Sequence, residues 1–369
     1  MHFSYVSFAK YSSVPLDPIV RTRRTNILFL MKSPSLLVRL LLPVLLLPGL
    51  SFAATSSAAR HVSGAAQEST SPSPQAVFLW PEGAPGALGA TEVDKPRMYI
   101  FLPGKRSTSA AVLVVPGGGY QHVAIGHEGF QIAQWLTAQG MTAFVLDYRV
   151  APYHYPVEIN EGRRAMRLIR AHAAQYGIDP NRLGVWGFSA GGHLASSLGT
   201  HCGAGEATAT DPVDRLDCRP DFMVLSYPVI SMELPEAHAG SRINLLGPDV
   251  DPKLEHEYSN QFAVTAQTPP TFLFATTKDP TVPVENTLDF YRALERAGVS
   301  AELHIYDYSN HGCGLCGSIQ PLSTWPLLLR NWMLQHALLP PDAPPMPPPQ
   351  PNFPSWVPGL QGPGEDLQR

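Results

Sequence analysis

Leu183-Gly184-Val185-Trp186-Gly187-Phe188-Ser189-Ala190-Gly191 is the stretch that decides the fold. It holds a Gly-x-Ser-x-Gly pattern directly after an apolar run, and the helix-like residues 193–198 follow it. In this context a sharp strand-to-helix turn presents the middle serine at the top of a sheet, with small neighbours that avoid clashes. The turn also places the hydroxyl beside a helix N-terminus, where negative charge is favoured. Ser189 is therefore a candidate nucleophile.

Three further loops follow apolar, strand-like runs. The glycine loop, Pro116-Gly117-Gly118-Gly119-Tyr120, follows residues 111–115. The acid loop around Asp279 follows residues 271–275, and the histidine loop around His311 follows residues 302–306. A base that takes the serine proton, an acid that orients the base and backbone N–H groups that bind an oxyanion are what acyl transfer requires.

The predicted site has three parts. The predicted catalytic residues are Ser189 as nucleophile, His311 as general base and Asp279 as the acid that orients it. The predicted oxyanion donors are the backbone N–H groups of Gly118, Gly119 and Ala190, and Tyr120 is predicted to bind substrate. Of the other histidines, His193 is expected to brace the serine turn, and the rest, His238 among them, to be surface or core residues. This chemistry needs no metal and no organic cofactor.

Strand-like and helix-like segments alternate from residue 77 to residue 339, which predicts a mostly parallel central sheet with helices on both faces. The predicted strands are 98–102, 111–115, 142–147, 183–187, 221–226, 271–275 and 302–306, and the predicted helices are 131–139, 161–176, 284–297 and 324–338. Residues 228–270 are expected to form loops or a small cap over the site. The order serine, acid, histidine, with the glycine loop upstream, is that of an α/β-hydrolase fold.

The two ends of the chain differ in composition from this middle part. Residues 31–53 read as a signal peptide, with Lys32, the apolar residues 40–50 and the small residues Ser51 and Ala53. Met31 is then the expected start, residues 1–30 an over-extension, and residues 54–76 a disordered linker. The domain is expected at 77–339 and a Pro-rich disordered tail at 340–369. The expected location is secreted or periplasmic with no stable membrane anchor after cleavage, the alternative being an uncleaved anchor.

The net charge and the cysteines limit which partners and ligands are expected. The net charge of −4 gives no reason to expect nucleic acid or an anionic membrane as a partner, and the oligomeric state is left open. Four cysteines, Cys202, Cys218, Cys313 and Cys316, allow three disulfide connectivities, and the spacing does not choose among them. Zinc at the C-x-x-C pair is the competing idea, but no second ligand pair accompanies it.

Together these motifs resemble secreted α/β-hydrolase esterases of the acetyl xylan esterase type, which include feruloyl esterase-like members and lie near the hormone-sensitive-lipase group. The resemblance is carried by the glycine loop and the acid loop, and by Leu79-Trp80-Pro81-Glu82-Gly83-Ala84-Pro85-Gly86, His127-Glu128-Gly129, Gly187-Phe188-Ser189-Ala190-Gly191-Gly192-His193-Leu194-Ala195 and His311-Gly312. It implies a serine esterase that removes short acyl groups, acetyl first among them, from a small-molecule, oligosaccharide or polysaccharide ester. The alternatives are a feruloyl or general carboxylesterase, a prolyl-oligopeptidase-type peptidase and a non-catalytic carbohydrate-binding protein.

Overall fold

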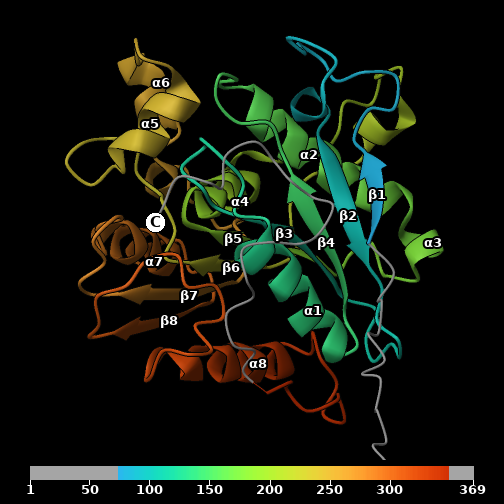
Figure 1. The fold of residues 1–369 in the computed structure, drawn as a ribbon, viewed down its shortest axis with the longest axis vertical. Helices are drawn as coiled ribbons and strands as arrows, with labels where there is room; N and C mark the ends of the chain where they lie inside the picture. The colour runs from blue at the N-terminus through green and yellow to red at the C-terminus, as the bar shows by residue number, and fades with distance from the viewer. Residues whose placement is uncertain (1–73, 349–369) are drawn as a thin grey trace, which may run out of the picture. The chain divides into compact units, whose positions relative to one another are not determined.

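The computed structural model describes residues 74–348, which form a central sheet covered by helices (Figure 1). The eight strands lie in the order β1-β2-β4-β3-β5-β6-β7-β8. The pairs β1–β2 and β2–β4 are antiparallel, and every other neighbouring pair is parallel. The strands are β1 Gln75–Phe78, β2 Arg97–Phe101, β3 Ala111–Val115, β4 Thr142–Asp147, β5 Leu183–Phe188, β6 Met223–Ser226, β7 Thr271–Thr276 and β8 Ala301–Tyr306. This topology confirms the predicted α/β-hydrolase fold.

The middle strands are apolar along their whole length because helices cover both of their faces. Every residue of β3, β5, β6 and β7 is buried, which is why these segments read as unbroken hydrophobic runs and do not alternate. In contrast, β8 at the edge of the sheet is only half-buried. Strands β3, β5, β6, β7 and β8 run parallel, so the loops that follow them meet at one edge of the sheet.

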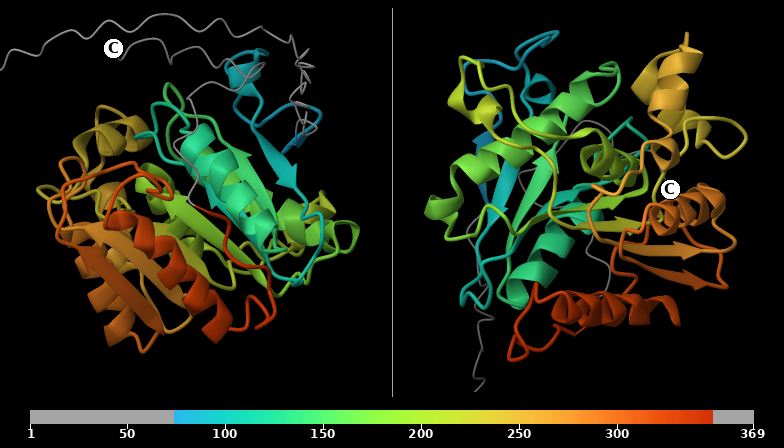
Figure 2. Two further views of the ribbon diagram at one scale, coloured as in Figure 1. Left: turned by 60° about the horizontal axis from the view of Figure 1, so that its bottom comes forward. Right: turned by 180° about the vertical axis from the view of Figure 1, so that it is seen from behind.

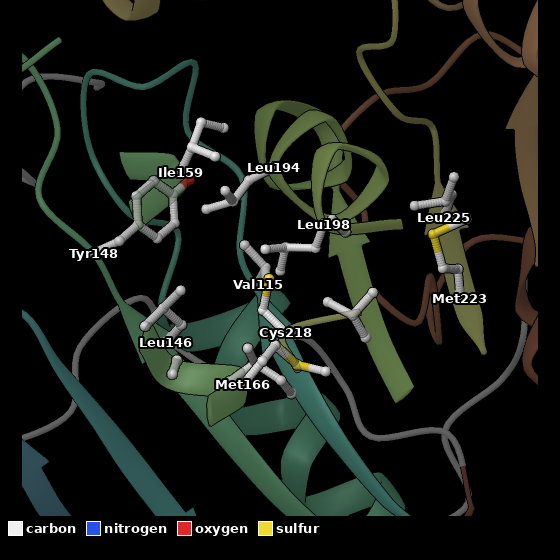
Figure 3. Packing of buried hydrophobic residues seen from close by; sticks show 14 of the residues in the cluster. Val115, Leu146, Tyr148, Ile159, Met166, Leu194, Leu198, Cys218, Met223 and Leu225 are labelled. Carbon is white, nitrogen blue, oxygen red and sulfur yellow. The ribbon is translucent and has the colours of Figure 1, made fainter. Parts of the chain in front are cut away.

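The helices form two layers. Apolar residues of α2, α4 and α7 belong to one buried cluster, with Ile159, Leu194 and Phe290 as examples, and part of this cluster is drawn in Figure 3. Residues of α1 and α8, such as Ile132 and Leu329, belong to a second cluster on the other face, and Figure 2 shows these two helices on the same side of the sheet. The helices are α1 Gln131–Ala138, α2 Val157–Ala171, α3 Ala173–Tyr176, α4 Ser189–His201, α5 Ala239–Leu246, α6 Pro252–Glu257, α7 Glu285–Arg296 and α8 Trp325–Gln335. The short helical segments are the 3₁₀ helices η1 Glu92–Asp94, η3 Pro212–Arg215, η4 Asn260–Phe262 and η5 Leu322–Thr324, and the π-helix η2 Gly126–Phe130.

Several predicted boundaries need correction. The domain begins before residue 77, because β1 starts at Gln75 and pairs with β2. The helix predicted at 161–176 begins four residues earlier, directly after Pro156, and it is interrupted at His172. The last helix ends at Gln335 and not at 338, since Ala337 adopts a left-handed backbone with φ 53°.

The tail predicted from residue 340 is folded at its start. Ala343 is buried in the core cluster, and Met346 packs against that cluster. Arg330 of α8 donates to the carbonyl oxygens of Ala343 at 3.2 Å and Pro344 at 3.3 Å. The prediction of a disordered tail is therefore wrong for this part, because apolar side chains between the prolines pack against the core cluster that α1 and α8 share.

The remaining expectations for the two ends, including the signal peptide at 31–53, fall on residues 1–73 and 349–369, outside the described residues. Within the part of the chain that the structure describes, none of the helices has the length and apolar character needed to cross a bilayer.

Candidate active site

Ser189 lies at the turn between β5 and α4. Phe188 is extended, whereas Ser189 already begins the helix with φ 49°, a left-handed conformation that is rare outside glycine. A Cβ atom at Gly187 would lie 2.3 Å from the carbonyl oxygen of Gly191, and one at Gly191 would lie 2.2 Å from that of Val115. The glycines on both sides of the serine are therefore required by backbone contacts, as the motif predicts.

The structure brings together the three side chains of the predicted catalytic group. His311 Nε2 lies 2.8 Å from Ser189 Oγ, and His311 Nδ1 lies 2.7 Å from Asp279 Oδ2. The other oxygen of Asp279 accepts from the backbone N–H groups of Thr281 at 2.8 Å and Val282 at 2.9 Å. With its Nδ1 proton donated to the fixed carboxylate, the imidazole presents Nε2 as the acceptor for the serine proton.

The glycine loop packs directly against the serine turn. Gly118 and Gly119 have φ values of 122° and 66°, and a Cβ atom at Gly118 would lie 2.1 Å from the carbonyl oxygen of His122. A Cβ atom at Gly117 would lie 2.9 Å from that of Ser189. Among the described residues the N–H groups of Gly118 and Gly119 have no hydrogen-bond acceptor. Ala190 lies in the first turn of α4, where N–H groups lack partners within the helix.

The buried carboxylate of Glu128 holds this loop by a hydrogen bond. Glu128 Oε2 accepts from the Gly117 N–H group and Oε1 from the Tyr227 hydroxyl, both at 2.8 Å. The Tyr227 hydroxyl in turn accepts from the N–H group of Gly314 at 2.8 Å. The sequence alone assigns neither side chain a role, although it contains the motif His127-Glu128-Gly129. Tyr227 could be identified from the sequence by its position directly after an apolar run, which the other site loops share.

The position of Tyr120 is at odds with the predicted substrate contact. Its side chain is fully buried, and its hydroxyl lies 2.9 Å from Nδ1 of His193. Nε2 of His193 lies 2.8 Å from the carbonyl oxygen of Tyr258, and burial lowers the pKa of His193 to about 4. The imidazole is therefore neutral, and it joins the glycine loop to α4. Tyr120 is a support of the loop, and the bracing role predicted for His193 fits its contacts.

Residues 228–270 reach the site through α5, which stands beside α6 in Figure 1. Asn244 of α5 donates to the carbonyl oxygen of Gly119 at 2.8 Å. Cε1 of His238 lies 3.7 Å from the position that a Cβ atom at Gly119 would take. Burial and the nearby charge of His311 lower the pKa of His238. His238 is thus a half-buried surface residue, as expected, and its place as the N-cap of α5 brings it beside the glycine loop.

The four cysteines form two disulfides, Cys202–Cys218 and Cys313–Cys316. The first joins the end of α4 to the segment before β6, and the second closes a short loop directly after His311-Gly312. Since the sulfur atoms of the C-x-x-C pair are bonded to each other, they do not form the thiolate pair that a zinc site needs.

The mostly parallel sheet, the serine turn and the loops that converge on it define an α/β hydrolase. Residues 98–294 match the family BD-FAE, and the chain belongs to this family. The chain is 41% identical to the crystal structure of an acetyl ester-xyloside bifunctional hydrolase from Caldicellulosiruptor lactoaceticus, with a TM-score of 0.69 over 73% of this chain and 98% of that one. The carboxylesterase Cest-2923 from Lactobacillus plantarum WCFS1 shares the fold at 22% identity, with a TM-score of 0.57 over 73% of this chain and 100% of that one.

Two longer relatives are similar over part of their length. The chain is 37% identical over 231 residues to an acetylxylan esterase of Xylanibacter ruminicola, which covers 62% of this chain and 45% of the relative. It is 35% identical over 224 residues to endo-1,4-beta-xylanase B of Butyrivibrio fibrisolvens, which covers 59% of this chain and 34% of the relative. The chain thus spans less than half the length of both proteins.

Proposed function

We propose that the protein is a serine carboxylic-ester hydrolase that removes short acyl groups, acetyl first among them, from a carbohydrate. The observation that carries the proposal is the position of His311, whose two ring nitrogens lie 2.8 Å from Ser189 Oγ and 2.7 Å from Asp279 Oδ2. The relatives named for acetylxylan and acetyl ester-xyloside substrates support the substrate class.

The proposed reaction has two half-reactions. Ser189 Oγ attacks the ester carbonyl carbon while its proton passes to His311 Nε2, and the carbonyl π electrons move onto the oxygen. The N–H groups of Gly118, Gly119 and Ala190 stabilise this oxyanion, and Asp279 stabilises the imidazolium. When the intermediate collapses, the alcohol leaves with the proton from His311. Water then attacks the acyl-enzyme in the same way, and the carboxylic acid and free Ser189 result.

We also propose that the protein acts outside the cytoplasm, secreted or in the periplasm. The support is the pattern of residues 31–53 and the two disulfides, a type of bond that persists in oxidising compartments. An N-terminal sequence of exported protein that begins within a few residues of Ala54 would support cleavage there. An N-terminus upstream of residue 31 would contradict it.

Substitution of the nucleophile tests the mechanism. Ser189→Ala is expected to lower kcat/KM for a nitrophenyl acetate by about 10⁶-fold, because the attacking oxygen is lost. It is also expected to abolish labelling by a fluorophosphonate. Ser109→Ala, at an exposed serine, is the control and should change neither. Labelling and turnover that survive in folded Ser189→Ala protein would refute the assignment.

A substrate panel tests the class of ester. Acetylated xylan and acetylated monosaccharides are expected to be hydrolysed with higher kcat/KM than feruloyl esters, and prolyl amides not at all. A preference for feruloyl esters would replace the acetyl assignment, and cleavage of the amide would favour a peptidase. Fluorophosphonate labelling without hydrolysis of any ester in the panel would contradict the proposed substrate class.

A further inference from the structure

We propose that Glu128 and Tyr227 act as a pair of positioning residues, which hold the glycine loop and the histidine loop at a fixed separation around Ser189. The inference rests on the proposed serine-hydrolase function and adds two residues to it. Neither side chain touches the reacting atoms in the mechanism above. Glu128 bonds to the loop that carries the proposed oxyanion donors, and Tyr227 packs its ring against His311 and bonds to the loop that follows it.

The pair forms a continuous chain of hydrogen bonds beneath the site. Glu128 accepts from the Gly117 N–H group with one oxygen and from the Tyr227 hydroxyl with the other, and Tyr227 accepts from the Gly314 N–H group. All three distances are 2.8 Å, and both side chains are buried. This row of hydrogen bonds therefore begins at the loop that supplies the proposed oxyanion donors and ends at the loop that carries His311.

The place of the pair in the fold explains why such a link is needed. The glycine loop follows β3 and the histidine loop follows β8, and β5, β6 and β7 lie between these two strands. Tyr227 follows β6, in the middle of this row. The two loops thus have no strand pairing in common, whereas catalysis requires their groups to be placed within about 0.5 Å. Tyr227 and Glu128 join them directly.

Packing alone would not require a charged carboxylate at residue 128. A buried carboxylate is costly, and an apolar or amide side chain could fill the same space. Within 4.0 Å, the one ion-pair partner of Glu128 among the described residues is the half-exposed imidazole of His127, whose Nε2 lies 3.8 Å from Oε1 and which carries a charge only when protonated. A Cβ atom at Gly312 would lie only 3.9 Å from the same oxygen. The carboxylate therefore lies beneath the histidine loop, where the imidazolium of the transition state forms.

Tyr227 itself contacts the base. Its ring centroid lies 4.9 Å from that of His311, with the planes at 62°. Its φ of 38° is unusual for a residue with a side chain, and such strained backbone clusters at functional sites. The tyrosine thus supports His311 with its ring and the following residues with its hydroxyl.

The test is kinetic. Tyr227→Phe keeps the ring against His311 and removes only the hydroxyl, and Glu128→Gln keeps the size and removes the charge. Each is expected to lower kcat for a nitrophenyl acetate by about 10- to 100-fold, with KM within about twofold, because misplaced groups mainly affect the transition state. The double variant is expected to be no slower than the poorer single one, since both break one chain of hydrogen bonds.

The pH profile gives a second readout that a merely structural role would not move. Glu128→Gln is expected to shift the acid limb of kcat/KM to lower pH, because removal of a negative charge disfavours the imidazolium of His311. The other titratable groups near His311 and Glu128 are the same in both proteins, namely Asp279, His238, His127, Tyr227 and Tyr148. An unshifted limb would contradict the role of the carboxylate charge.

The chain offers a matched control in Tyr153. Its hydroxyl also donates to a carboxylate, that of Asp94, and also accepts a backbone N–H group, that of Leu88 at 2.9 Å. Tyr153→Phe loses the same pattern of bonds and should change kcat by less than twofold. Equal losses of kcat in Tyr153→Phe and Tyr227→Phe, or wild-type kcat in Tyr227→Phe, would overturn the proposal. Wild-type protein that neither hydrolyses esters nor reacts with a fluorophosphonate would instead overturn the proposed function.

Discussion

Ser189 and Gly118 show what the site requires of single residues. Both have positive φ, 49° and 122°, in segments that meet where the glycine loop packs on the serine turn. Such backbone is costly for a residue with a side chain, by about 1–3 kcal/mol, and it persists only where surrounding contacts hold it. At Gly118 the cost would be compounded by the carbonyl oxygen of His122, 2.1 Å from the position of a Cβ atom. We infer that steric contacts of the backbone place the N–H groups that we propose as oxyanion donors.

Gly118→Ala tests this inference at the residue scale. It is expected to lower kcat by about 100-fold or more as well as the Tm, because the loop must move to relieve the contact and a displaced donor is lost. The control is Gly83→Ala, at a φ of 120° with no heavy atom within 4 Å of the added Cβ. That variant should lower the Tm alone. The two are compared by melting curves and by turnover of a nitrophenyl acetate, and wild-type turnover in Gly118→Ala would contradict the assignment.

At the scale of elements, the two disulfides have different consequences. Cys202–Cys218 has a sequence separation of 16 and joins the far end of α4, away from Ser189, to the segment before β6. Cys313–Cys316 has a separation of 3 and shapes the loop that follows His311. A cross-link stabilises mainly by restricting the unfolded chain, and more so for longer loops. The first disulfide is thus a stability element, and the second constrains the site.

Removal of each disulfide should therefore change a different property. Cys202→Ala with Cys218→Ala is expected to lower the free energy of unfolding by about 3 kcal/mol with little change in kcat. Cys313→Ala with Cys316→Ala is expected to lower it by only about 1.5 kcal/mol and to reduce kcat severalfold, since the histidine loop is freed. Urea unfolding and turnover at 25 °C measure the two effects. Equal losses of kcat in both double variants would contradict this division.

At the scale of the whole molecule, the sheet and its two helix layers bury a carboxyl group that forms no ion pair among the described residues. Glu158 in the first turn of α2 is fully buried, and neither of its oxygens has a hydrogen-bond partner among the described residues. Burial, with a smaller contribution from Glu161, raises the pKa of Glu158 to about 8. The folded protein thus holds a proton there that the unfolded chain releases near its ordinary pKa. Stability is therefore lost as pH rises from about 4.5 through about 8.

Glu158→Gln should remove this pH dependence. Between pH 5 and pH 8 the free energy of unfolding is expected to fall more steeply with pH in the wild type than in the variant, by about 1 kcal/mol per pH unit. The upper limit for one proton is about 1.4 kcal/mol per pH unit. Urea denaturation at a series of pH values measures the slope. Glu92→Gln is the control, because its carboxyl is exposed and its ion pairs with Lys95 and Arg97 lower its pKa. Equal slopes in wild type and Glu158→Gln would show that Glu158 is already ionised in the folded state.

The sequence by itself determined where the buried parallel strands lie along the chain, the serine turn and the identity of the three side chains that meet there. Buried parallel strands read as unbroken apolar runs, and a strained turn admits only small neighbours, so both leave a local signal. Four features had no such signal: the inward direction of Tyr120, the position of His238, the packing of Ala343 and the link from Glu128 to Tyr227.

Those features were decided only by the tertiary structure, for one physical reason. Whether a side chain points to solvent or into the interior depends on which partners the folded chain brings into contact with it. Glu128 and Tyr227 are 99 residues apart in the sequence, and Gly314 lies 87 residues beyond Tyr227. Residue types and their spacing do not reveal contacts between residues so far apart. The order of the strands in the sheet brings these residues together, because it places the two loops on either side of β6.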